Sequence, residues 1–208
     1  MTNHQNFLLY ESLIRSAYIL IGWFVKWVYL PEDFNYKTDE EYIFPLTDIP
    51  LFSDYTEVWT TSLAILLVIL TYYYRQFTTL KMANKTFMTC LQQVLIPTLV
   101  FNTYFVVIHY FLKPWARHEL TGFKISGHIF QTGIANGILI RTVLWAIDSR
   151  STLDHRMVST LSVISAITIA FRWYQDFCTA IFFHTVAECI VGYIFSFVTI
   201  LFFVNPKK

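Results

Sequence analysis

The sequence predicts an all-α membrane protein, a polytopic bundle of six helices that cross a lipid bilayer. Of its 208 residues, 55% are hydrophobic, 19% aromatic and only 14% charged, whereas a soluble domain of this size carries roughly 25% charged residues. Six stretches also approach the length of about 20 mostly apolar residues that a span needs. Because lipid offers no partner for backbone amides, such spans are expected to be helices.

The predicted spans belong to one transmembrane domain that covers residues 1–208. Their bounds are roughly 12–30, 57–74, 88–112, 126–147, 157–173 and 177–203. Tyrosine and tryptophan cluster near several of the span ends, as at Tyr72–Tyr74 and Trp173, which is typical of membrane interfaces. No basic stretch precedes the first apolar run and no small-residue cleavage site follows it, so we expect a retained span rather than a cleaved signal.

The longest predicted connection is an acidic loop over residues 31–56. It holds seven carboxylates against the single lysine Lys37, together with three prolines. We interpret it as a solvated cap without chemistry of its own. If the chain instead serves as a subunit of a larger membrane complex, this loop is the expected docking surface.

Basic residues indicate the orientation of the predicted bundle. Six spans place both termini on one side, which also carries more lysine and arginine: Arg75, Lys81, Lys85, Arg150, Arg156, Lys207 and Lys208, against Lys37, Lys113, Arg117, Lys124 and Arg172 opposite. By the positive-inside rule the termini are cytoplasmic. The glycosylation sequon at Asn84 would then face the cytoplasm and stay unmodified.

Composition also excludes several classes of function. A net charge of +1 gives no basic patch for nucleic acid. There is no CxxC motif, and the histidine boxes of di-iron membrane enzymes are missing, so neither a metal nor another cofactor is implied. Cys90, Cys178 and Cys189 lie in apolar segments and are expected to pack as small hydrophobic residues.

Two histidines are the candidate catalytic residues, because ionisable groups are rare in spans without a function. His128 follows the start of the fourth predicted span, and His184 lies about two turns into the sixth. Two crossings separate these spans, so they run in the same direction and enter from the side opposite the termini. Both imidazoles are therefore expected near the non-cytoplasmic surface.

Neighbouring residues suggest phosphate chemistry at these histidines. The stretch Lys124-Ile125-Ser126-Gly127-His128 opens a helix, whose first N–H groups attract anions. Ser126 is a natural N-cap, and its hydroxyl could serve the backbone or a ligand. Glu188, four residues after His184, could orient that ring and make it a better base or nucleophile. The alternative is a capped helix with a buried histidine, beside a structural His–Glu pair.

Other polar side chains have simpler explanations at this stage. His109 is more readily a satisfied core histidine than a part of the site. Lys113, Arg117, Lys124 and Arg172 lie on the same side as the two histidines and are expected to extend along apolar surface to the interface. Lys124, four residues before His128, is the one that we favour as a phosphate ligand.

Two motifs together resemble a known family. Gly122-Phe123-Lys124-Ile125-Ser126-Gly127-His128-Ile129-Phe130, and Cys178-Thr179-Ala180-Ile181-Phe182-Phe183-His184 followed by Gly192, look like those of the fat storage-inducing transmembrane proteins. These are six-span endoplasmic reticulum proteins related to the type-2 phosphatidic acid phosphatases. The likeness is close at the fourth span and the start of the sixth; elsewhere it depends on the number and order of spans.

The resemblance implies a lipid-phosphatase-like bundle with its active site facing the lumen. It implies cleavage of the phosphoanhydride of fatty acyl-CoA to acyl 4′-phosphopantetheine and adenosine 3′,5′-bisphosphate, in support of lipid droplet formation and membrane lipid balance. By motif, His184 matches the nucleophile, His128 the acid that protonates the leaving group, and Glu188 an orienting acid. Lys124, Ser126 and Gly127 would hold the anionic oxygens, and membrane lipids would surround the acyl chain.

The chain departs from the wider phosphatase pattern in two places. Cys178 stands where that superfamily has an arginine, and the superfamily's first basic motif is absent. Two rivals therefore stay open: a phosphatase acting on a lipid phosphate, and a non-catalytic lipid-binding or accessory protein whose histidines are structural.

Overall fold

A computed structural model describes residues 3–30, 80–119, 125–148, 153 and 155–204, and its regular structure is helical throughout. The helices are α1 (Asn3–Tyr29), α4 (Leu80–Cys90), α5 (Ile96–Val107), α6 (Lys113–Glu119), α7 (Gly127–Asp148), α8 (His155–Phe182) and α9 (Val186–Val204). The predicted second span over 57–74 and the acidic loop over 31–56 lie outside the described residues.

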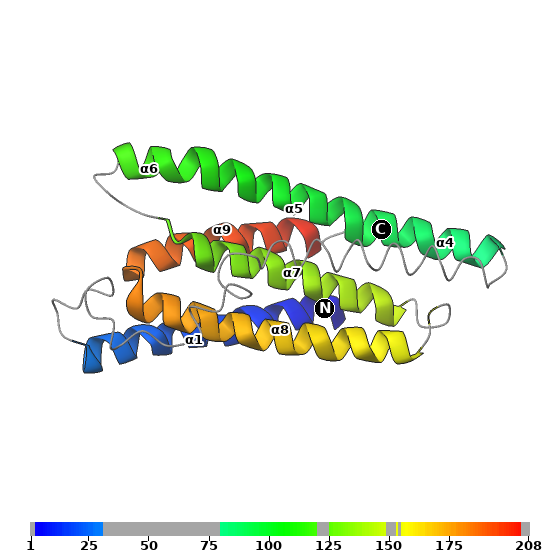
Figure 1. Ribbon diagram of the computed structural model, residues 1–208, viewed down its shortest axis with the longest axis horizontal. Helices are drawn as coiled ribbons and strands as arrows, with labels where there is room; N and C mark the ends of the chain where they lie inside the picture. The colour runs from blue at the N-terminus through cyan, green and yellow to red at the C-terminus, as the bar shows by residue number, and fades with distance from the viewer. Residues whose placement is uncertain (1–2, 31–79, 120–124, 149–152, 154, 205–208) are drawn as a thin grey trace.

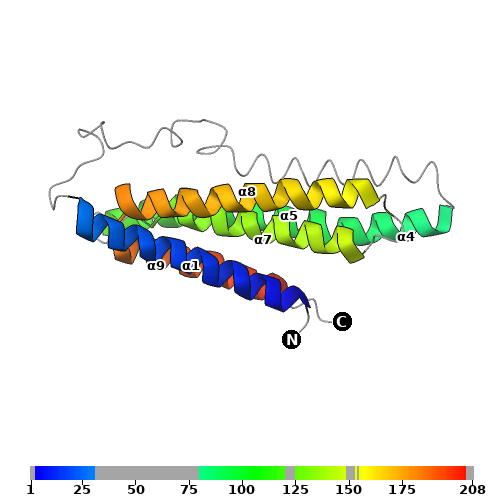
Figure 2. The same ribbon diagram turned by 90° about the horizontal axis from the view of Figure 1, so that it is seen from below.

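The helices lie lengthwise in an elongated bundle (Figures 1 and 2). Helix α7 is its centre: most of its side chains are buried, and it packs against both α8 and α9. Helix α1 lies along α8 and also contacts α9. Figure 1 shows α7 and α9 running in one direction and α1 and α8 running in the other. One end of the bundle therefore collects the ends of α1, α6 and α8 and the starts of α7 and α9; we call it the site end.

Three helices of the described part are long and apolar enough to cross a membrane: Phe87–Glu119, Gly127–Asp148 and His155–Phe182. A shorter apolar helical stretch covers Val186–Phe197. Helix α1 begins at Asn3, well before the predicted start of the first span at residue 12, and carries Glu11, Arg15 and Lys26. Its outward side chains are nevertheless large and apolar, with Phe24 59% and Trp27 82% exposed.

Helix segments α4, α5 and α6 follow one another through two π-helical turns, Leu91–Leu95 and Ile108–Leu112, each of which ends two residues before a proline. Proline has no N–H to donate to the carbonyl four residues back, and a π turn is one way to absorb that defect. Before Pro97, the carbonyl concerned is that of Gln93, and it accepts a hydrogen bond from Arg141 Nε of α7 at 2.5 Å. The predicted span over 88–112 is therefore part of a longer helix.

The predicted boundary between the fifth and sixth spans is wrong. We placed it at residues 174–176, but α8 continues without interruption to Phe182 and α9 begins at Val186. Residues 174–176 are polar or aromatic, yet Asp176 is fully buried within the bundle. The polar residues there form an internal contact and not a loop. Because the break between the helices falls at residues 183–185, His184 lies between α8 and α9 and not two turns inside one helix.

Candidate functional site

The start of α9 is built by a reciprocal pair of side-chain caps. Thr185 Oγ1 accepts a hydrogen bond from Glu188 N–H at 3.4 Å, and Glu188 Oε2 accepts one from Thr185 N–H at 3.0 Å. This is the capping box that Thr-x-x-Glu encodes, in which two N–H groups at the start of a helix gain partners. It explains locally why the chain breaks and restarts as a helix here. The sequence contains this signal, and we had not used it.

The same carboxylate oxygen holds His184. Glu188 Oε2 lies 3.2 Å from His184 Nδ1, and the two side chains are only 12% and 11% exposed. The structure therefore brings together the pair that the sequence predicted, although across a helix start instead of along one helix face. When Nδ1 carries the proton and donates it to the carboxylate, the ring lone pair is on Nε2. Lys26 of α1 approaches from the other side, with its ammonium 3.4 Å from the His184 carbonyl oxygen.

The start of α7 docks directly on the start of α9. Ser126 N–H donates to the Glu188 carbonyl oxygen at 3.3 Å. Gly192 makes this approach feasible, because a Cβ at that position would lie 2.6 Å from the Ser126 carbonyl oxygen. The two sequence motifs, one at the fourth predicted span and one at the sixth, thus meet through backbone contacts at the site end.

Ser126 serves the backbone. Its Oγ accepts a hydrogen bond from Ile129 N–H at 3.4 Å, and the residue is fully buried. This geometry confirms the predicted N-cap, and it answers the question that the sequence left open, since the hydroxyl is used by the helix. Gly127 and His128 follow as the first two residues of α7, and both are half-buried.

The His128 ring lies near the end of α8. Its ring centroid lies 6.4 Å from that of Phe183, the residue before His184. Lys124, the phosphate ligand that we favoured, lies outside the described residues. Cys178, at the position of the superfamily arginine, is buried within α8, six residues before His184.

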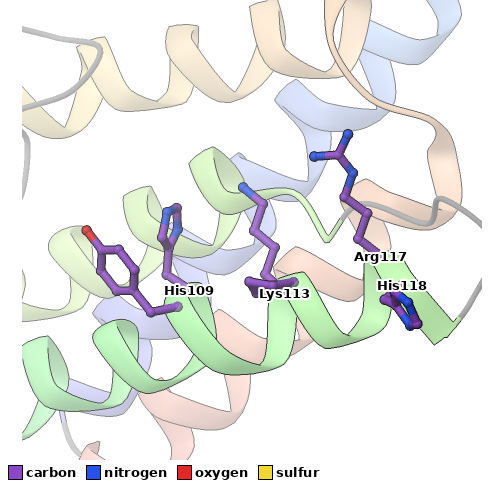
Figure 3. Close-up of a pocket in the computed structure, with 6 residues that line it drawn as sticks. His109, Lys113, Arg117 and His118 are labelled. Carbon is purple, nitrogen blue, oxygen red and sulfur yellow. The ribbon is translucent and has the colours of Figure 1, made fainter.

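Helix α6 and the π-helical turn Ile108–Leu112 before it add basic side chains to the site end. An open pocket of about 580 Å³ is lined by His109, Tyr110, Lys113, Pro114, Arg117 and His118. In Figure 3, His109, Lys113 and Arg117 extend from one side of this helix and His118 from the opposite side. A Cβ on Gly127 would lie 3.0 Å from Lys113 Nζ and 3.6 Å from His109 Nδ1, so both side chains reach the start of α7. His109 is thus part of this end, and it also stacks on Phe105 at 5.1 Å.

A second polar cluster, which the sequence analysis missed, lies inside the bundle. Arg15 of α1 donates to Asp176 Oδ2 of α8 at 2.5 Å and to Ser196 Oγ of α9 at 2.8 Å. It also donates to the Ile129 carbonyl oxygen of α7. Thr132 Oγ1 donates to the other Asp176 oxygen at 2.5 Å. We call these residues the Arg15 cluster, and they join four helices through groups that are at least 99% buried.

The Arg15 cluster continues through α7 to a second pair of charges. Asn136 Nδ2 donates to Glu11 Oε1 at 2.9 Å, and Arg172 Nη1 donates to Asn136 Oδ1 at 3.5 Å. Arg172 is only 1% exposed, so our expectation that it extends to the interface is wrong. Glu11 and Arg15, like Arg172 and Asp176, are four residues apart on one helix. That spacing of opposite charges within apolar segments is the signal that could have revealed the cluster.

The described part of the chain therefore defines a helical protein with three helices long and apolar enough to cross a membrane, and with several histidines gathered at one end of its bundle. Within this part, no group of three or more histidine, cysteine, aspartate or glutamate side chains is placed to hold a metal ion. Comparisons with protein-family models, curated proteins and solved structures find no match.

Proposed function

We propose that this chain is a multi-pass endoplasmic reticulum enzyme that cleaves the phosphoanhydride of fatty acyl-CoA, with His184 as nucleophile. The observation that carries the proposal is the 3.2 Å contact of His184 Nδ1 with Glu188, beside the start of α7. A carboxylate on Nδ1 orients the imidazole and stabilises it when it becomes positively charged. The family resemblance supplies the substrate and the role in lipid droplet formation and membrane lipid balance.

The proposed reaction has two steps that balance. His184 Nε2 attacks one phosphorus, a P–N bond forms, and the bond from that phosphorus to the bridging oxygen breaks. The leaving oxygen takes the electron pair and receives a proton from His128. Water then cleaves the P–N bond and restores His184. Attack at either phosphorus gives the same products, acyl 4′-phosphopantetheine and adenosine 3′,5′-bisphosphate.

The proposed membrane arrangement follows the sequence. Six spans would place both termini in the cytoplasm and the site end in the lumen. The acyl chain would lie among the helices, so the bilayer itself provides the apolar part of substrate binding. The anionic oxygens would be held by Lys124 and by the N–H groups at the helix start of Ser126 and Gly127.

The test is hydrolysis of acyl-CoA by the purified protein, with release of adenosine 3′,5′-bisphosphate as the readout. His184→Ala and His128→Ala are each expected to lower kcat by at least about 100-fold, the usual range for loss of a nucleophile or a general acid. His155→Ala is the matched control, because that imidazole is exposed at the start of α8, at the opposite end of the bundle. Equal rates for the wild type and both site variants would end the proposal.

A second candidate function is a non-catalytic lipid-binding or accessory role, and the capping box favours it. Glu188 already has a structural purpose at Thr185 N–H, and the buried Cys178 removes one phosphate ligand. Glu188→Gln separates the two readings, since an amide still caps Thr185 but cannot stabilise a charged imidazole. If Glu188→Gln loses hydrolysis while its melting temperature is unchanged, the result supports catalysis. If His184→Ala leaves lipid droplet formation unchanged, the result supports the accessory role. Release of inorganic phosphate from phosphatidic acid, with acyl-CoA left intact, would instead identify a lipid phosphate phosphatase.

A further inference from the structure

Three nitrogen-bearing side chains form a ladder along one side of α6 and the π-helical turn Ile108–Leu112 before it. His109, Lys113 and Arg117 are spaced four residues apart, so successive side chains lie about 6 Å apart along the helix. They line the open pocket together with Tyr110, Pro114 and His118, and no carboxylate of the described residues lines it. Figure 3 shows the three side chains directed to the same side of the helix.

The ladder approaches the start of α7 through two of its members, whereas Arg117 is exposed. Lys113 Nζ and His109 Nδ1 reach Gly127, where a Cβ would lie 3.0 Å and 3.6 Å from them. Lys113 is half-buried, so its ammonium is brought near the partially positive end of a helix. A basic side chain that only extends to lipid headgroups would run away from the bundle. Several positive groups that converge on one pocket favour a ligand with more than one negative charge.

We propose that Lys113 and Arg117, with His109, bind the phosphates of the nucleotide part of the substrate, a ribose that carries separate phosphate groups. This assignment rests on the proposed function for the identity of the ligand. Two basic side chains spaced about one helical turn apart suit phosphates on different carbons of one sugar better than a single headgroup phosphate. The ladder takes the place of the arginine that Cys178 replaces, and it does so from a different helix.

The experiment measures binding of adenosine 3′,5′-bisphosphate, and separately of inorganic phosphate, to the full-length protein in lipid nanodiscs at constant ionic strength. The wild type is expected to bind the bisphosphate more tightly than phosphate. Lys113→Gln and Arg117→Gln should each weaken bisphosphate binding about threefold to tenfold, and the double variant about 10- to 100-fold. Arg156→Gln is the control, because it removes the same charge from an exposed position at the opposite end of the bundle. Circular dichroism and the melting temperature confirm that each variant is folded.

The outcomes separate this proposal from the proposed reaction. His184→Ala should bind the bisphosphate as the wild type does. If the wild type hydrolyses no acyl-CoA but still binds the bisphosphate through Lys113 and Arg117, the subsite stands and the reaction does not. Equal affinity of the wild type and the double variant overturns the subsite, even if hydrolysis is observed. Response to phosphatidic acid in the nanodiscs without response to the bisphosphate overturns it too, and assigns the ladder to a lipid headgroup.

Discussion

The Arg15 cluster allows a prediction about the folding energy of the bundle. With Glu11 and Arg172, the second pair of charges beside it, the cluster holds two acids, Glu11 and Asp176, and two arginines, Arg15 and Arg172, all at most 3% exposed. The formal charges cancel. Asp176→Ala removes one of them and leaves a net positive charge, with Arg15 deprived of its 2.5 Å partner. Breaking a buried ion pair by removing one member costs about 3–5 kcal/mol of unfolding free energy, because the remaining charge stays desolvated.

The complementary change distinguishes charge balance from packing. In the Arg15→Met variant, the Asp176 carboxylate keeps one hydrogen bond within this cluster, the one from Thr132 at 2.5 Å. This variant should also lose about 3–5 kcal/mol of unfolding free energy. The double variant, Arg15→Met with Asp176→Leu, restores neutrality with apolar side chains. It should therefore lose less unfolding free energy than either single variant, because the two residues share one contact and no unpaired charge is left in it.

The measurement is the free energy of unfolding in mixed detergent micelles, followed by circular dichroism. Ser165→Ala is a suitable reference, because it alters a buried side chain of α8 that belongs to no ion pair in the cluster. A double variant whose loss equals the sum of the two single losses would refute the reasoning, since it would show that Arg15 and Asp176 contribute independently.

Three further predictions concern the site end and the orientation. Gly192→Val should lower the unfolding free energy by about 1–3 kcal/mol and reduce hydrolysis, because its Cβ would lie 2.6 Å from the Ser126 carbonyl oxygen. Gly127→Ala should be much milder in a melting experiment, because its Cβ would come close only to the flexible end of Lys113, at 3.0 Å, and would lie at ordinary contact distance from His109. Thr185→Ala should lower the unfolding free energy by about 1 kcal/mol, because it removes the hydroxyl cap of α9. The His184–Glu188 contact and the activity should persist, and a loss of activity as large as that of His184→Ala would contradict this prediction. Asn84→Gln should leave the electrophoretic mobility of protein from microsomes unchanged, because the exposed Asn84 side chain faces the cytoplasm in the predicted topology; a glycan at Asn84 would invert that topology.

Composition and apolar run length were sufficient to predict helices and a membrane environment. They predicted α7 closely, since 126–147 differs from Gly127–Asp148 by one residue at each end. They failed at the α8–α9 boundary, because the polar residues 174–176 were placed between two spans, whereas Asp176 is a buried partner of Arg15 within α8. Hydropathy alone cannot separate a polar residue that faces water from one that faces a buried partner on another helix.

The candidate site shows the same division between local and distant information. Spacing along the chain was enough to pair His184 with Glu188 and to make Ser126 an N-cap, because both contacts are formed within one turn. The convergence of α6 and the π-helical turn before it on Gly127 depends on helix packing. No spacing rule connects Lys113 to Gly127, so its role could not be distinguished from simple extension to the interface.

The Arg15 cluster also has a consequence for biosynthesis. Asp176 follows Arg15 by 161 residues. At about 5–20 residues per second, the ribosome adds that length in roughly 8–32 s. During this interval Arg15 has a nearer counter-charge in Glu11, four residues earlier on the same helix. Helix α1 therefore carries a compensating charge for Arg15 until the later helices are synthesised and complete its contacts.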